Sequence, residues 1–375
     1  PRRGSRIALR PIGIFVYDPI VFRRSRVPMQ TPRCDRARHA LALIAIAVLP
    51  LTRGMAAPEP DPDWPCWRGP RRDGLLSPRR WPARLEGDAL SRIWRVKLGP
   101  SYSGPIAGLG KVFVTETEDE KYEKVRALDR DTGKEIWSAR WEGAMKVAFF
   151  AASNGSWIRA TPALDGDRLY VAGMRDRLVC LDASSGAIVW NVDCMERFGT
   201  PLPAFGFVSS PLVLGDAVYV QAGASFLKLD KKTGETIWRT LADEGGMYGS
   251  AFSSPIAARI RDTDQIVVQT RRDLAGVDPA SGKVLWSQEV PAFQGMNILT
   301  PTVFEDAIFT SSYGGGSFLF RVAKDGGTFR VSEAWKARTQ GYMCSPLLIR
   351  SNPVDANLYI HLRDRRFACI DWKTG

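Results

Sequence analysis

Aromatic and polar residues recur just before each Ser-Pro or Thr-Pro pair, and their chemistry suits binding. Arginine and amide groups bind oxygen-rich ligands, and aromatic rings stack on flat ligands or on a partner's side chains. If the strand after each proline is the innermost of its unit, these segments surround one centre on one face. The candidates for cofactor or partner binding there are Trp157, Arg159, Phe207, Tyr248, Asn297 and Gln340. Alternatively, the neighbouring hydroxyls only satisfy buried backbone groups.

Motifs for catalysis and metal binding are absent from the sequence. It contains no Gly-x-Ser-x-Gly, no P-loop and no His-Glu-x-x-His, and its histidines are His39 and His361 alone. Catalytic residues are therefore not assigned, and no metal ligands are predicted. Two acidic runs, residues 116–120 and 243–246, carry carboxylates of the kind that bind Ca²⁺. We interpret both runs as solvated loops.

A short repeated motif positions these segments. It consists of an Asp, a Gly four residues later and a Trp four residues after that. Its complete copies contain Asp129, Gly133 and Trp137; Asp182, Gly186 and Trp190; Asp230, Gly234 and Trp238; and Asp278, Gly282 and Trp286. The turn glycines are 53, 48 and 48 residues apart, and a shortened copy at residues 370–375 follows 93 residues later. Self-similarity at this period indicates a repeat architecture.

Each copy predicts a β-hairpin, in which Asp accepts backbone N–H groups and Gly takes a positive φ. A two-stranded hairpin cannot bury an indole alone, so Trp should pack on a neighbouring unit. A second hairpin, with turns such as Gly166-Asp167, follows each Ser/Thr-Pro pair. Two hairpins per period make a four-stranded sheet, the unit of a β-propeller.

The predicted fold is therefore an all-β propeller of four-stranded blades over residues 91–375. A degenerate unit, residues 320–335, fills the gap in the repeat, and Trp94 is interpreted as the orphan outer strand of a blade. We expect six to seven blades in this chain, with the propeller incomplete at its C-terminus.

The net charge of +12 lies mostly in the first 57 residues, which contain eleven Arg and two Asp. The remaining residues have a net charge of about +3, which is too small to indicate a surface that binds nucleic acid. The apolar run at residues 40–49, preceded by Arg and followed by small residues, is too short for a membrane span and typical of a secretory signal. We therefore expect a periplasmic or cell-envelope protein without a stable membrane span, the alternative being an N-terminal membrane anchor.

These features predict four segments. Residues 1–28 are upstream of a start at Met29, residues 29–57 are the signal peptide, residues 58–90 are an entry segment, and the propeller follows. The expected mature chain keeps five cysteines, an odd number. Cys180 and Cys194 flank one hairpin with poor geometry for a disulfide, and Cys180 and Cys369, which share one repeat position, are interpreted as core residues.

The phrase Asp-x-x-Thr-Gly-x-x-x-Trp and its Ser/Thr-Pro partner resemble the tryptophan-docking repeat of propellers related to pyrroloquinoline quinone (PQQ) enzymes. The stretch Asp63–Gly74 is similar to the entry segment of a BamB-like exported family of planctomycete-type bacteria. This resemblance implies eight blades in a complete protein. Propellers of the WD-repeat type are excluded, because Gly-His and Trp-Asp phrases are missing.

Two functions are consistent with the resemblance. The first is a non-catalytic scaffold that binds a protein or a small ligand on a propeller face. The second is a quinoprotein dehydrogenase for alcohols or sugars, which would hold PQQ with Ca²⁺ near Trp157 and Arg159. The adjacent cysteine pair of the alcohol dehydrogenases is missing here, no catalytic Asp aligns, and a fold does not define an activity. We therefore favour the scaffold.

Overall fold

The computed structural model describes residues 63–76, 84–341, 343–352 and 355–375. These residues belong to two compact units, residues 63–78 with 96–375 and a unit whose described part is residues 84–95. The smaller part contains the 3₁₀ helix η1 (Gly87–Ala89), and all strands described below lie in the larger one. The predicted leader and signal peptide lie outside the described residues.

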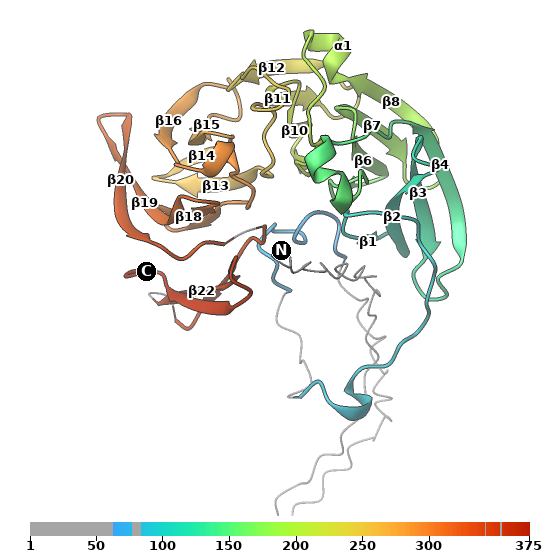
Figure 1. Cartoon of the computed structure of the whole chain (residues 1–375), viewed down its shortest axis with the longest axis horizontal. Helices are drawn as coiled ribbons and strands as arrows, with labels where there is room; N and C mark the ends of the chain where they lie inside the picture. The colour runs from blue at the N-terminus through green and yellow to red at the C-terminus, as the bar shows by residue number, and fades with distance from the viewer. Residues whose placement is uncertain (1–62, 77–83, 342, 353–354) are drawn as a thin grey trace, which may run out of the picture. The chain divides into compact units, whose positions relative to one another are not determined.

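Within the described residues, the strands form six antiparallel sheets, which we call blades 1 to 6 (Figure 1). Blades 1 to 3 contain β1 (Ile106–Gly108), β2 (Lys111–Glu118), β3 (Tyr122–Asp129), β4 (Glu135–Glu142), β5 (Ala163–Asp165), β6 (Arg168–Gly173), β7 (Arg177–Asp182), β8 (Ile188–Asp193), β9 (Leu212–Leu214), β10 (Ala217–Ala222), β11 (Ser225–Asp230) and β12 (Thr236–Thr240). Blades 4 to 6 contain β13 (Ile256–Ile260), β14 (Thr263–Gln269), β15 (Asp273–Val277), β16 (Val284–Glu289), β17 (Thr302–Phe304), β18 (Ala307–Ser312), β19 (Gly316–Asp325), β20 (Thr328–Ala337), β21 (Leu347–Arg350), β22 (Ala356–His361) and β23 (Phe367–Asp371). The first five blades have four strands and blade 6 has three, which confirms the predicted propeller.

The turn of each repeat has the predicted chemistry. In blade 1, Oδ1 of Asp129 accepts hydrogen bonds from the backbone N–H and the hydroxyl of Thr132, at 2.8 and 2.7 Å. Gly133 has φ +70°, a conformation that costs glycine little because it has no Cβ. The strand register shifts between Ala127 and Leu128, which is the expected bulge. Local side-chain chemistry therefore defines this hairpin before any blade packs.

The repeat tryptophans join one blade to the next. Each of four indoles donates its N–H to the carbonyl of the residue just after the Asp of the following turn: Trp137 to Ala183, Trp190 to Lys231, Trp238 to Pro279 and Trp335 to Trp372. The same indoles lie against the turn glycine of that next copy. The motif thus has two halves, a turn and an anchor, that act in neighbouring blades.

Trp286 departs from this pattern. The next hairpin, β19 with β20, is longer than the others, so its tip at Gly326 does not present the usual turn. Trp286 instead donates to Oε1 of the buried Gln265 in its own blade, at 2.7 Å. The degenerate unit at residues 320–335 is confirmed as blade 5, and its altered turn redirects the preceding tryptophan.

The core of the unit lies between the blades. Buried apolar clusters join blades 1 and 2 around Phe113 and Leu169, and blades 2 and 3 around Tyr170 and Val218. Further clusters join each later pair in the same way. Burial of apolar area between neighbouring sheets is what holds a propeller together, since a single four-stranded sheet has no core of its own.

The hydroxyls of the Ser/Thr-Pro pairs form a relay across the first strands. The N–H of Gly104 donates to Oγ1 of Thr161, the N–H of Thr161 to Oγ of Ser210, and that of Ser210 to Oγ of Ser254, all within 3.1 Å. These contacts follow the structural alternative, in which hydroxyls satisfy buried backbone groups. The strands after the prolines, β1, β5 and β9, contact one another and are innermost as expected.

The outer strand expected around Trp94 belongs to a blade that is not among the six, so that expectation stays a prediction; within the described residues, residues 93–96 are not in a strand. One other expectation is wrong. Glu116 to Glu118 lie in β2 and not in a solvated loop. Glu116 is 6 % exposed and accepts a hydrogen bond from the N–H of Gly99 at 2.6 Å.

Candidate binding face

One end of the propeller carries the longest loops of the unit. Because successive strands are antiparallel, the loops between blades and the hairpins between second and third strands emerge at the same end. We call this end the loop face. It comprises the loops 143–162, 194–211, 241–255 and 290–301, the described residues 338–341 and 343–346, and the hairpins 119–121, 174–176, 223–224, 270–272, 313–315 and 362–366. The segments predicted to bind a ligand belong to these loops.

A row of four phenylalanines crosses the loop face over blades 1 to 4. Phe149 and Phe150 begin the 3₁₀ helix η2 (Phe149–Asn154) and are 90 % and 59 % exposed. The ring of Phe150 lies 6.1 Å from that of Phe205, which lies 5.6 Å from that of Phe252. We call Phe149, Phe150, Phe205 and Phe252 the aromatic row. Phe205 and Phe252 are half-buried, so Phe149 and Phe150 supply the exposed rings of the row, and exposed aromatic rings favour an apolar partner.

Arg271 anchors the end of this row. Its guanidinium lies 4.3 Å from the ring centre of Phe252 and donates to the carbonyl oxygens of Gly249 and Gln294, at 3.2 and 2.7 Å. Burial lowers the pKa of Arg271, the effect being opposed by the charge of Asp243. The residue therefore fixes two neighbouring loops and leaves the phenylalanine ring in a defined position.

A second aromatic pair continues the face over blades 5 and 6. Phe293, which begins the 3₁₀ helix η3 (Phe293–Gly295), is 54 % exposed and packs edge-on against Tyr313. The guanidinium of Arg363 lies 4.2 Å from the ring centre of Tyr313 and donates to its hydroxyl at 2.9 Å. Aromatic rings capped by arginines therefore recur along the loops, although no single sequence motif encodes them.

The predicted site residues do not converge on one pocket. Trp157 and Arg159 do come together, through Tyr102, whose ring lies 5.1 Å from the indole and 5.3 Å from the guanidinium. Tyr248 is 71 % exposed on another loop. Gln340 accepts a hydrogen bond from the N–H of Gly314 and borders an open cavity beside Arg338 and Arg363.

The remaining two candidates, Phe207 and Asn297, are buried at 2 % and 1 % exposure. Phe207 packs in the core between blades 2 and 3. The amide of Asn297 donates to the carbonyls of Arg271 and Val290 at 3.1 and 3.2 Å. Both side chains position loops of the face and present nothing to a ligand in this conformation.

The cluster at Trp157 is a poor fit for PQQ with Ca²⁺. The indole is partly buried and packs against Tyr102 and the backbone of Gly155, which leaves less of its surface for a stacked ring system. Arg159 donates to the carbonyl of Gly155 and lies over Tyr102. Within the described ranges no three His, Cys, Asp or Glu side chains group together as metal ligands.

Two buried carboxylates that sequence reasoning missed hold the hairpin at residues 174–176 from both sides. Glu123 of blade 1 accepts the N–H of Met174 at 2.5 Å and the indole N–H of Trp141 at 3.0 Å. Asp176 accepts the N–H of Gly223 in blade 3 at 2.7 Å. Burial raises the pKa of Glu123 to about 7 and that of Asp176 to about 6. The available signal for Glu123 was a carboxylate at an inward position of strand β3.

Antiparallel blades, Trp anchors on the next turn and a loop face together define a β-propeller of PQQ-like, tryptophan-docking repeats. The model of the family described as outer membrane protein assembly factor BamB matches residues 121–375. The chain belongs to this family. Within the described residues, no helix has the length and apolar character that a membrane crossing requires.

Relatives in this family and outside it are distant. An outer membrane protein assembly factor BamB from Moranella endobia is 22 % identical over 60 % of this chain and 58 % of its own length. A quinoprotein ethanol dehydrogenase of Pseudomonas putida is 24 % identical over 39 % of this chain and 23 % of its own. The chain thus spans little more than half of its BamB relative and far less of the dehydrogenase.

A solved structure shares the fold. The quinohemoprotein alcohol dehydrogenase ADHIIG from Pseudomonas putida HK5 has a TM-score of 0.52 and 12 % identity, over 73 % of this chain and 58 % of that one. At this identity the likeness concerns the fold alone.

Proposed function

We propose that this protein is a non-catalytic scaffold of the cell envelope that binds a protein partner on the loop face of its propeller. The observation that carries the proposal is the aromatic row, where Phe149 and Phe150 are 90 % and 59 % exposed and lead to rings held by Arg271. Aromatic and arginine side chains are enriched where proteins bind proteins. The name of the BamB relatives, assembly factors for outer membrane proteins, supports a protein partner.

The proposal is tested by site-specific photo-crosslinking in the cell envelope. A crosslinking amino acid at position 150 should give one discrete adduct that mass spectrometry identifies as the same protein obtained from position 293. Position 188 on the outer strand β8, where Ile188 is 47 % exposed, is the matched control and should not give this adduct. Equal adducts at all three positions, or none at 150 and 293, would contradict a docking face.

The alternative is a PQQ-dependent dehydrogenase, which the quinoprotein relatives found by sequence favour. Its test is to add PQQ and Ca²⁺ to the purified chain and to follow dye reduction with alcohols and sugars. Saturable PQQ binding with dye reduction would replace the scaffold by an enzyme. The geometry around Trp157 supports the opposite outcome, because Tyr102 and Gly155 already pack against the indole.

A further inference from the structure

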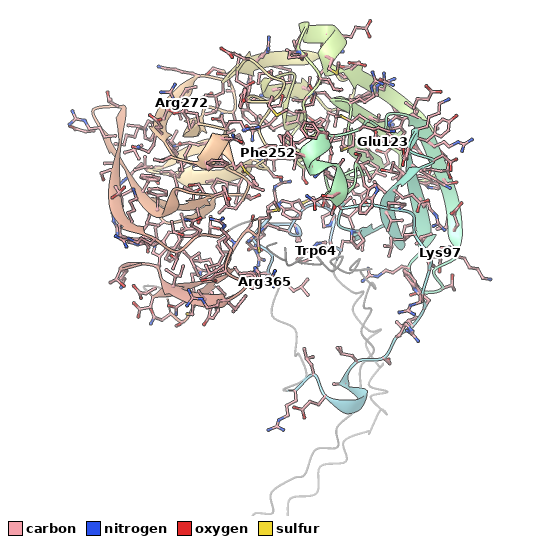
Figure 2. All side chains as sticks on the ribbon, viewed as in Figure 1. Trp64, Lys97, Glu123, Phe252, Arg272 and Arg365 are labelled. Atoms are coloured by element: carbon pink, nitrogen blue, oxygen red, sulfur yellow. The ribbon has the colours of Figure 1, made fainter. Side chains whose placement is uncertain are left out.

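Residues 63–76, which we call the axial segment, run along the innermost strands of the propeller unit. The backbone of Trp64 pairs with Ala107 of β1 in both directions, at 2.8 and 2.9 Å. The carbonyl of Pro65 accepts the N–H of Leu164 in β5 at 2.8 Å. Figure 2 shows Trp64 on the inner side of the blades. The segment therefore joins blades 1 and 2 through backbone hydrogen bonds.

Side chains of the same segment reach three further blades. The guanidinium of Arg72 donates to the carbonyls of Pro211 and Ser210, at 2.7 and 3.1 Å. The indole N–H of Trp67 donates to the hydroxyl of Thr300 at 3.1 Å, and Arg68 donates to the carbonyl of Pro346 at 2.5 Å. All four acceptors belong to Ser/Thr-Pro pairs, the repeated phrase at the start of each blade.

The fit of the segment is specific. Arg72 is 3 % exposed, and backbone carbonyls, with no carboxylate, accept its hydrogen bonds. Gly69 has φ +78°, and a Cβ there would lie 2.7 Å from the ring of Trp64. A Cβ at Gly74, with φ +79°, would meet Leu347 at 2.5 Å. Buried donors paired with carbonyls and a backbone shape that requires glycine are features of a bound peptide.

We propose that the axis of the propeller is a peptide-binding site, and that residues 63–76 are its resident ligand. The site takes a peptide that pairs with β1 at Trp64 and then follows a series of turns. Its indole and guanidinium groups donate to the carbonyls and hydroxyls of the Ser/Thr-Pro pairs. A partner on the loop face then meets the aromatic row and not an open channel. This inference does not rest on the proposed function, because it concerns a contact of the chain with itself.

The first test separates the segment from the blades without removing it. A site-specific protease sequence is inserted between Leu85 and Glu86, both exposed, and the full chain is cut there. The N-terminal fragment should co-elute with the propeller in gel filtration. Arg72→Ala should release it, whereas the matched control Arg71→Ala should retain it, because Arg71 is 53 % exposed and its ion pair among the described residues is with Asp73 of the same segment. Release from the unsubstituted protein, or equal behaviour of the two variants, would overturn the proposal.

The second test places the substitution in a peptide, so that folding of the protein is not affected. A fluorescent peptide of residues 63–76 is titrated into the cut, unsubstituted protein, and anisotropy reports exchange with the resident fragment. We expect saturable binding, at least tenfold weaker binding of the peptide with Arg72→Ala, and a change below twofold with Arg71→Ala. No exchange by the unsubstituted peptide, or equal affinity of all three, would refute a sequence-specific site. Crosslinking at position 150 is independent of either result.

Discussion

The indole N–H of Trp137 donates to the carbonyl of Ala183 at 3.1 Å, across the boundary between blades 1 and 2. The same indole lies so close to Gly186 that a Cβ there would be 2.5 Å from the ring. The glycine of the repeat thus serves two purposes, a positive φ within its own turn and a flat surface for the tryptophan of the preceding blade.

Gly186→Ala should therefore destabilise the protein through both effects. The matched control is Gly166→Ala, which has φ +56° but no atom within 4 Å of the added Cβ. We expect a loss of about 3 kcal/mol for the first and about 1 kcal/mol for the second, since backbone strain and overpacking add only at Gly186. Urea unfolding measures both. Equal losses of unfolding free energy in the two variants would mean that the contact with Trp137 does not contribute to stability.

Replacement of the repeat tryptophans by phenylalanine should have unequal costs. Trp286→Phe leaves Oε1 of Gln265 buried without its donor, whereas Trp238→Phe leaves the carbonyl of Pro279 with bonds from Lys228 and Tyr219. The first should lose about 2 kcal/mol more than the second, the cost of an unpaired buried acceptor. The measurement is the free energy of unfolding in urea. A smaller loss for Trp286→Phe than for Trp238→Phe would contradict the view that Oε1 of Gln265 is left as an unpaired buried acceptor.

Stability should fall as the pH rises from 5 to 8. Burial raises the pKa of Glu123 from 4.5 to about 7, so the native state holds the proton more tightly than the unfolded chain. Its stabilising contribution is complete below the unfolded pKa and is lost as the pH rises through about 7, on the order of 3 kcal/mol in total. Urea unfolding at several pH values should show this slope.

Glu123→Gln should flatten that pH dependence, because the amide does not titrate. Glu142→Gln is the control, since Glu142 is 68 % exposed and pairs with Lys121 at the surface. An unchanged slope in Glu123→Gln would assign the pH dependence to another group, Asp176 being the next buried carboxylate.

Replacing Phe149 and Phe150 by serine should leave stability nearly unchanged, within about 0.5 kcal/mol, because both side chains are exposed. Crosslinking from position 293 to the envelope partner should fall at least tenfold. The equivalent double replacement of Ile188 and Val189, exposed at 47 % and 44 % on β8, should leave that crosslinking intact. Loss of crosslinking to the partner in both double variants would indicate a general effect on folding.

The cysteines should differ in reactivity in the native state. Cys369 was expected in the core like Cys180 but is exposed, because its strand β23 lies at the edge of the three-stranded blade 6. Cys180 and Cys194 are buried, and burial raises the pKa of Cys180 to about 12. Iodoacetamide should therefore modify Cys369 first and the two buried thiols only after unfolding, because the thiolate is the reactive form. Mass spectrometry over time follows each site. A disulfide between Cys180 and Cys194 would contradict the free thiols of the structure.

Several features of the fold follow from local sequence chemistry alone. Asp129 and Gly133 define a turn from within five residues, and a period of 48 residues implies a repeated four-stranded sheet. The packing of Trp137 on a neighbouring blade also follows from the sequence, because a single hairpin cannot bury an indole. Such features are predictable since their causes lie close together in the chain and recur in every copy.

The site depended on contacts that the repeat does not encode. Arg72 meets Ser210 and Pro211 from well over a hundred residues away, and Phe150 meets Phe205 from the next loop between blades. Glu123 is a surface-type residue in the sequence, and only the packing of blade 2 buries it. Local turn chemistry and periodicity determine the blades, whereas their packing decides which loops, carboxylates and entry residues come together.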